Sequence, residues 1–221
     1  MSKYPIIEYT LFNANRNVGY SDPTSPLLLF RGSLLAKIAV PPSDTMYVVV
    51  LHLNPWHNDD MNNIRLEEIK GILKLVAPLK RFPILLMGDF NALSPKDGST
   101  GTEALTIAYL ESQEYRDAYR FLHPNPAMDT GKTNADGRID YVFSNNRLKA
   151  LQCYPVRSGQ FGFLGFGTSD HLAVSIARSN SKESMHVFGS SSLNWRFAFP
   201  NRKVVHGEIV DLLGKPAGQR P

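Results

Sequence analysis

Apolar segments of strand length that end in polar side chains constrain this chain more than any other feature. Such segments cover residues 46–53, 83–87, 139–144 and 172–176. A polar or ionisable side chain that is buried without a partner costs several kcal/mol, so a fold either pairs such groups or uses them. We therefore expect the polar residues at these strand ends to meet in one site; they are His52, Asp89, Asn91, Asp140, Asp170 and His171.

The spacing of apolar residues predicts a layered α/β body. Residues 48–51 run without alternation, which is typical of a strand that is covered on both faces. Apolar positions at helical spacing predict an amphipathic helix over 62–79, between the strands at 46–53 and 83–87. The segment 33–40 should pair with 46–53 as a hairpin around Pro41-Pro42, and 101–110 reads as a second helix.

Composition indicates one folded domain with an extension. Of the 221 residues, 43% are hydrophobic and 20% charged, which is ordinary globular composition. Beyond Arg178 the chain becomes rich in serine, glycine and asparagine. We predict a domain over 1–178 and a loosely ordered C-terminal extension over 179–221.

Charge and cysteine usage set the broad class. The formal net charge is +4, which argues neither for nor against nucleic acid as a substrate. Cys153 is the single cysteine, so no internal disulfide can form. The sequence shows neither a signal peptide nor the roughly 18 apolar residues that a membrane span needs. An intracellular, cytoplasmic location is the default expectation.

Short motifs in a fixed order carry a family resemblance. His52-Leu53, Gly88-Asp89-Phe90-Asn91, Arg138-Ile139-Asp140-Tyr141 and Ser169-Asp170-His171 resemble, in that order, motifs of the endonuclease/exonuclease/phosphatase (DNase I-like) superfamily. The resemblance implies a two-sheet β-sandwich flanked by helices. It also implies a phosphoesterase in which a divalent cation, usually Mg²⁺ with Mn²⁺ as the alternative, assists attack of water on a phosphodiester or phosphomonoester.

The resemblance also implies roles for the motif residues. Asp89 would orient or deprotonate the attacking water, and Asn91 would hold that water or a phosphate oxygen. His52 would reach a phosphate oxygen from the opposite side.

The last two motifs supply the remaining roles. Asp170 would help to hold the metal, directly or through water. His171 would contact the scissile phosphate, and Asp140 would bond to the other nitrogen of that ring and fix its orientation.

The chain departs from the superfamily pattern at its start. A strand that ends in Asn and a later metal-binding Glu normally open the domain, whereas residues 1–6 resemble the segment that follows them. Glu8, Asn13 and Asn15 have the required types in the wrong order. We therefore predict an N-terminally truncated domain with weakened metal binding. The uncovered sheet edge favours a partner at that edge.

Single residues have plainer interpretations. Asp89 could cap the turn after Gly88, and His52 could be a satisfied core histidine. Arg65 and Glu68, at i, i+3 spacing, suggest a solvated helix face. A zinc site is disfavoured by the spacing of the histidines and carboxylates that would form it, which are His52, His57, Asp59 and Asp60.

Function classes stay open at this point. The alternative to an esterase is a catalytically weak or inactive module that binds phosphate or a partner. A two-metal phosphatase is disfavoured because the chain has no Gly-Asn-His string. The substrate could be a nucleic acid, a phospholipid or an inositol phosphate, since this fold hosts all of these activities.

Overall fold

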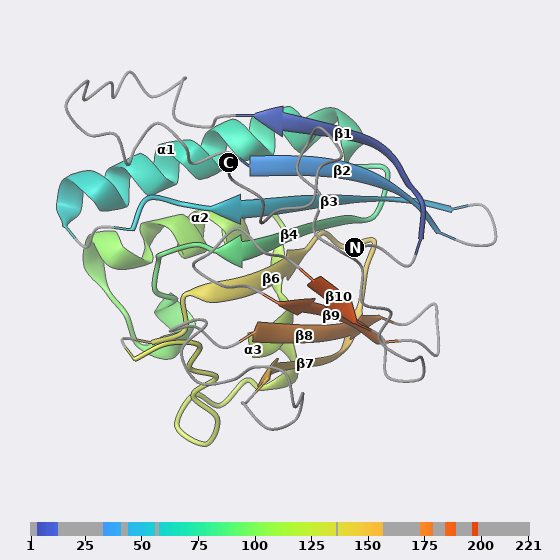
Figure 1. Cartoon of the computed structure of the whole chain (residues 1–221). Coiled ribbons are helices and arrows are strands. Elements are labelled where there is room, and N and C mark those ends of the chain that lie inside the picture. The colour runs from blue at the N-terminus through green and yellow to red at the C-terminus, as the bar shows by residue number, and fades with distance from the viewer. Residues whose placement is uncertain are drawn as a thin grey trace, which may run out of the picture.

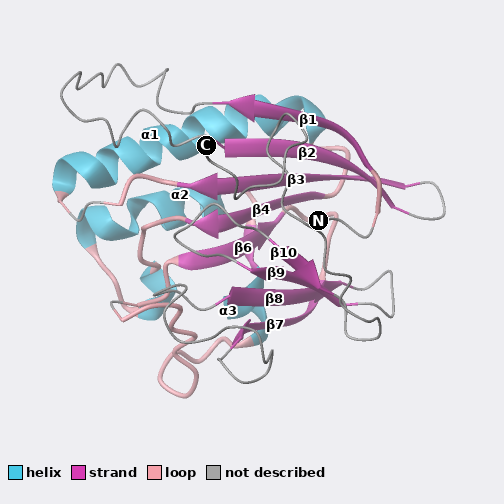
Figure 2. Cartoon of the chain, in the orientation of Figure 1, coloured by secondary structure: helices cyan, strands magenta, loops and turns pink. Residues whose placement is uncertain are grey.

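The computed structural model contains two β-sheets that pack against each other, with helices packed against them (Figure 1; Figure 2). The fold therefore has the α/β sandwich architecture that the sequence predicts. The structure describes residues 4–12, 33–40, 44–55, 58–135, 137–156, 173–178, 184–188 and 196–198.

The larger sheet has six strands in the order β1-β2-β3-β4-β6-β5. β2 and β3 form the predicted antiparallel hairpin, with Val40 opposite Asp44. β3 and β4 are parallel, and β4 and β6 are antiparallel. The strands are β1 (Ile6–Phe12), β2 (Ser33–Val40), β3 (Asp44–His52), β4 (Ile84–Asp89), β5 (Arg116–Asp117) and β6 (Asp140–Ser144).

The helices connect the strands of this sheet. α1 (Asp59–Val76) links β3 to β4, and the side chain of Asn58 caps it by accepting a hydrogen bond from the Met61 amide at 3.0 Å. A 3-10 turn with Pro78 at its second position follows α1 directly, which agrees with the predicted end of the helix. The other helices are α2 (Leu105–Ser112) and α3 (Ala118–Leu122).

Two apolar cores explain the unbroken apolar runs in the central strands. Val49 and Leu86 pack in the core that α1 and α2 cover, whereas Val48 and Leu85 pack in the core between the two sheets. Successive side chains of a strand point to opposite faces, so a strand that is covered on both sides must be apolar at every position. The central strands β3 and β4 therefore contribute side chains to an apolar core on each face of the sheet.

The smaller sheet has four strands in the order β10-β9-β8-β7. Because β9 pairs with β8, this sheet continues past the predicted boundary at residue 178. The prediction of a loosely ordered extension stays a prediction, and 199–221 lies outside the described residues. The strands are β7 (Ala150–Val156), β8 (Ala173–Arg178), β9 (Ser184–Phe188) and β10 (Arg196–Ala198).

β1 forms one edge of the six-stranded sheet and carries exposed apolar side chains. Ile7, Tyr9 and Leu11 are 55%, 60% and 61% exposed. Tyr9 lies opposite Ala36, whose side chain belongs to the core between the sheets. A partner at this edge stays a prediction. No helix in the described part of the chain is long and apolar enough to cross a membrane.

Candidate active site

Three neighbouring strands place three of the predicted residues side by side. His52 ends β3 and lies opposite Asp89 at the end of the parallel strand β4. Asp89 in turn lies opposite Asp140, the first residue of the antiparallel strand β6. Side chains at paired positions of neighbouring strands point to the same face of a sheet. The sheet therefore brings together His52, Asp89 and Asp140, which are 88 residues apart at most.

The imidazole of His52 contacts the carboxylate of Asp89. Nε2 of His52 lies 3.4 Å from Oδ2 of Asp89, and the two side chains are 34% and 11% exposed. A protonated imidazole at this position would carry positive charge to the solvent-facing side of the carboxylate. A ligand can therefore reach the pair at the partly exposed imidazole of His52, whereas the carboxylate of Asp89 is largely buried.

Asn91 is bound to both neighbouring strand ends. The backbone amide of Asn91 donates to Oδ1 of Asp89 at 2.8 Å, and its side-chain Nδ2 donates to the backbone carbonyl of Leu53 at 3.0 Å. Asn91 has a positive φ of 48°, a conformation that asparagine adopts more readily than most residues. The turn-cap interpretation of Asp89 is therefore correct, and it coexists with the contact between Asp89 and His52.

Gly88 allows β4 to approach β3 closely. Its φ is 139°, and a Cβ atom at this position would lie 1.9 Å from the carbonyl oxygen of Leu51. Any other residue would collide with the neighbouring backbone, which would move Asp89 away from His52. The glycine of the Gly-Asp motif thus sets the spacing between the two strand ends.

Asp140 is held by the loop that precedes it. The amides of Ile139 and Asp140 both donate to Oγ1 of Thr133 at 3.1 Å. The carbonyl of Ile139 accepts from the amide of Phe90 at 2.9 Å, which joins this loop to the turn after β4. These contacts fix the backbone of Asp140 at the strand end.

The last motif falls outside the described residues. Asp170 and His171 belong to 157–172, as do the glycine-rich residues before them, and His57 is likewise outside. Among the residues that the structure does describe, no three histidine, cysteine, aspartate or glutamate side chains form a group that could hold a metal. Asp89 and Asp140 supply hard carboxylate oxygens of the kind that Mg²⁺ takes, and this ion commonly keeps several waters. The described donors therefore fit part of a magnesium site.

A buried cluster on α1 holds the chain just beyond His52. Arg65 and Glu68 are each 1% exposed, so the predicted solvated helix face is wrong. Nη1 of Arg65 donates to the carbonyl of Asn54 at 2.8 Å, and the amide of Asn54 donates to Oε2 of Glu68 at 3.1 Å. Arg65 also donates to Oδ1 of Asn62. We call Asn54, Asn62, Arg65 and Glu68 the Arg65 cluster.

Burial dominates the electrostatics of Arg65. It lowers the pKa of the guanidinium from its usual value, while the negative charges of Glu68, Asp89 and Glu103 oppose that shift. Arg65 is thus electrostatically coupled to Asp89, and it also donates hydrogen bonds to the carbonyl of Asn54 and to Asn62. Arg65 therefore holds the segment that follows His52 in place.

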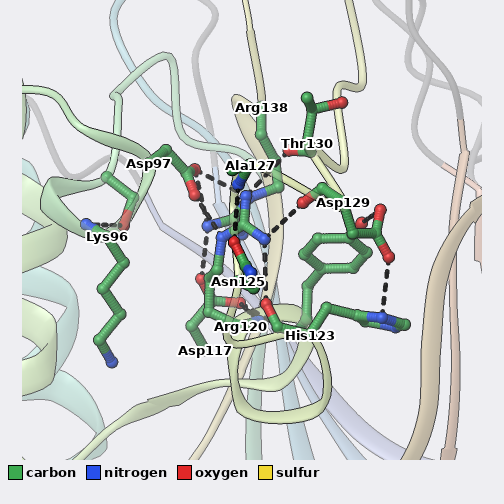
Figure 3. Close-up of polar contacts among 12 residues, drawn as sticks. Lys96, Asp97, Asp117, Arg120, His123, Asn125, Ala127, Asp129, Thr130 and Arg138 are labelled. Carbon is green, nitrogen blue, oxygen red and sulfur yellow. Dashed lines mark hydrogen bonds and ion pairs between the residues drawn. The ribbon is translucent and has the colours of Figure 1, made fainter.

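A second buried cluster lies among the segments that follow β4 and precede β6 (Figure 3). Arg138 contacts Asp97 and Asp117, with Nη2 2.9 Å from Oδ2 of Asp97 and 2.7 Å from Oδ2 of Asp117. Arg120 pairs with the same Asp97, and its Nη1 and Nη2 donate to the carbonyls of Asp129 and Thr130 at 2.7 and 3.0 Å. We call Asp97, Asp117, Arg120 and Arg138 the Arg138 cluster.

The Arg138 cluster ties three separate segments together. Asp97 follows the Asn91 turn, Asp117 caps α3 by accepting from the Tyr119 amide at 3.0 Å, and Arg138 precedes β6. Burial alone would lower the pKa of Arg138, but Asp117, Tyr141 and Asp97 outweigh it, so the net pKa is raised. The loops that carry Asp89 and Asp140 are therefore joined through paired charges.

The sequence matches the Endonuclease/Exonuclease/phosphatase family over residues 2–171. The chain belongs to this family. No significant match was found among curated protein sequences. The motif order that suggested the resemblance is thus confirmed as a family relationship, while the role of each residue stays a prediction.

Solved structures of the Endonuclease/Exonuclease/phosphatase fold are similar to this chain. The human Nocturnin catalytic domain has a TM-score of 0.57 at 12% identity, over 80% of this chain and 60% of that one. A family protein from Beutenbergia cavernae has a TM-score of 0.56 at 19% sequence identity, over 94% of this chain and 58% of that one. The mannosyl-6-phosphatase Bt3783 of Bacteroides thetaiotaomicron has a TM-score of 0.56 at 17% sequence identity, over 80% of this chain and 67% of that one.

These likenesses establish the fold and leave the substrate open. The chain spans 58–67% of the length of the three structures named above. Identities of 12–19% carry the arrangement of strands and helices and no more.

Residue spacing could have revealed part of what the motifs missed. Arg65 lies four residues before Ile69 and seven before Ile72, so it falls on the buried stripe of α1. The Arg138 cluster leaves no such trace, because Arg138 and Asp97 are 41 residues apart. Family motifs marked Arg138 only as the neighbour of Asp140.

Proposed function

We propose that this chain is a metal-dependent phosphoesterase that hydrolyses a phosphodiester or phosphomonoester by attack of water. The observation that carries the proposal is the meeting of His52, Asp89 and Asp140 at adjacent strand ends in a chain of the Endonuclease/Exonuclease/phosphatase family. Family membership supports a divalent cation as the cofactor, with Mg²⁺ expected and Mn²⁺ as a substitute.

The side chains have distinct tasks in this proposal. Asp89 orients the attacking water and accepts its proton, because its Oδ1 is already held by the Asn91 amide while Oδ2 faces His52. His52 offers a positive charge to a phosphate oxygen on the exposed side of the pair. Asn91 keeps the turn in place through its bond to Leu53.

The cation would be held by carboxylates. Asp140 and Asp89 are the described candidates, and Asp170 is the candidate from the family motif. A bound Mg²⁺ would polarise the phosphoryl oxygen and neutralise charge that develops on it. Asp140 would also orient His171, the proposed partner of the scissile phosphate.

Hydrolysis of a general phosphodiester, bis(p-nitrophenyl) phosphate, and of the monoester p-nitrophenyl phosphate tests this proposal. We expect release of nitrophenol that requires Mg²⁺ or Mn²⁺ and falls by roughly 100-fold or more in Asp89→Asn, since a positioned acid–base group contributes on this order. Asp44→Asn is the matched control, because Asp44 is an exposed carboxylate at the other end of β3.

The two general substrates also separate the esterase from its alternative. Equal rates in wild type and Asp89→Asn would contradict the assigned role of Asp89. Binding of inorganic phosphate without turnover of either ester would instead support a phosphate-binding module. That outcome would replace the esterase proposal.

A further inference from the structure

Basic side chains gather at the end of the six-stranded sheet that lies opposite the candidate site. β4 and β6 are antiparallel, and Leu85 near the start of β4 lies opposite Ser144 at the end of β6. The start of β4 is thus at the far end from Asp89 (Figure 1). The exposed basic residues here, which we call the basic end patch, are Lys80, Arg81, Arg116, Arg147 and Lys149.

A buried asparagine fixes the two loops of the patch against each other. Asn145 is 7% exposed, and its Nδ2 donates to the carbonyl of Phe82 at 2.8 Å. Its Oδ1 accepts from the amides of Ile84 and Arg147 at 3.2 and 3.3 Å. The segment with Lys80 and Arg81 is therefore held beside the turn with Arg147 and Lys149. Arg116 joins them because it pairs with Ser144, the residue before Asn145.

The charges of the patch are not neutralised by carboxylates of the described chain. Lys37, Lys70 and Lys96 each lie within 4 Å of a glutamate, at 3.9, 2.5 and 2.7 Å. None of the five patch residues makes such an ion pair with any residue that the structure describes. Acidic residues nearby include Glu114, which lines a small pocket together with Lys80 and Asn145. Asp44, at the start of the parallel strand β3, lies at the same end of the sheet. The patch thus presents an excess of positive charge on fixed loops.

Aromatic rings support two of the arginines. The guanidinium of Arg81 lies 4.8 Å from the centre of the Phe82 ring, and that of Arg116 lies 4.6 Å from the centre of the Phe121 ring. Phe121 is 39% exposed. Arginine planes and exposed aromatic rings are the surfaces on which unpaired bases stack, and arginine binds phosphate through two hydrogen bonds. These features favour a single-stranded nucleic acid over a lipid surface as the ligand.

We propose that the basic end patch binds single-stranded nucleic acid through its phosphates, at a place separate from the candidate active site. The patch would capture the strand by charge and hold bases against Arg81 and Arg116. This binding does not depend on hydrolysis, because the patch shares no residue with the His52 and Asp89 end of the sheet.

Salt dependence of binding tests the proposal. The measurement is fluorescence anisotropy of a labelled oligothymidylate of about 20 nucleotides, with EDTA present and sodium chloride from about 50 to 200 mM. Each phosphate contact contributes about −0.7 to the slope of log K against log salt, so five contacts predict roughly −3.5. In Arg81→Ala/Arg147→Ala we expect about −2.1 and roughly tenfold or more weaker binding at the lowest salt.

The matched control removes two cations that already have partners. Lys37→Ala/Lys70→Ala changes the net charge by the same amount, and both lysines lie beside glutamates. We expect wild-type slope and affinity in this variant. An equal loss in the control would show a net-charge effect and would overturn the proposal.

Two further arms distinguish other sources of binding. Asp89→Asn is expected to keep the wild-type slope, whereas loss of oligothymidylate binding in that variant would place the contact at the candidate active site. Vesicles that contain phosphatidylserine are expected not to bind. Vesicle binding that is lost in Arg81→Ala/Arg147→Ala, without oligothymidylate binding in wild type, would assign the patch to membranes instead.

Discussion

The Arg65 cluster and the Arg138 cluster both lie near the strand ends of the candidate site, and their arginines contact different kinds of groups within the chain. Arg138 is paired with two carboxylates from distant parts of the chain, Asp97 and Asp117. Arg65 binds the carbonyl of Asn54 and the side chain of Asn62, both on the segment from β3 into its own helix. The first cluster joins loops through charge, and the second positions one loop through its backbone.

The opposite pKa shifts express this difference. Burial lowers the pKa of Arg65, and Glu68 offsets it only in part. For Arg138 the paired carboxylates outweigh burial, and the pKa is raised. A buried charge is tolerated when its partners compensate its lost hydration. We infer that the fold depends more heavily on the Arg138 pairs than on the charge of Arg65.

The largest effect is expected from Arg138→Met. This change leaves the carboxylate of Asp117, which is 1% exposed, without its paired guanidinium. Removing one member of a buried ion pair typically costs about 3–5 kcal/mol. Urea unfolding should show a loss of that order in the free energy of unfolding.

A control separates charge pairing from simple loss of an arginine. Arg147→Met removes an exposed arginine and is expected to stay within about 0.5 kcal/mol of wild type. A cost under about 1 kcal/mol for Arg138→Met would mean that the Arg138 cluster does not stabilise the fold as described.

A smaller effect is expected from Arg65→Met. The carbonyl of Asn54 and the side chain of Asn62 each lose a donor, and an unsatisfied buried group costs about 1–3 kcal/mol. We expect a loss of about 2 kcal/mol in urea unfolding. The amide of Asn54 should also exchange faster with solvent, because the loop that it belongs to is no longer held.

Glu68→Gln sharpens the same comparison. Glutamine keeps an oxygen that can accept from the Asn54 amide, so hydrogen bonding survives while the charge is lost. We expect a cost below that of Arg65→Met. A larger cost in Glu68→Gln would show that charge, rather than backbone bonding, dominates the Arg65 cluster.

The sequence predicted the parts of the fold whose pattern is local. Unbroken apolar runs gave β3 and β4, and helical spacing gave α1. β1 was not predicted as a strand, although apolar Ile7, Tyr9 and Leu11 alternate with polar residues there, which is the pattern of a strand. In the structure these three apolar side chains are exposed at the sheet edge.

For the candidate site too, the sequence predicted only the residues that a local pattern marks. The strand ends supplied His52, Asp89 and Asp140, because motif order and strand position coincide there. The supporting charges were missed or misplaced: Arg65 was assigned to solvent from its i, i+3 partner, and the pairs of Arg138 connect segments far apart in sequence. Long-range pairing leaves no periodic trace along the chain.

Two-dimensional ¹H–¹⁵N NMR of the isotope-labelled chain, titrated with inorganic phosphate in the presence of Mg²⁺, tests the central claim most directly. Phosphate bound at the ends of β3, β4 and β6 would alter the amide signals of His52, Asn91 and Asp140. That pattern is the predicted result. Shifts that spare His52, Asn91 and Asp140, with phosphate bound elsewhere, would contradict the placement of the site.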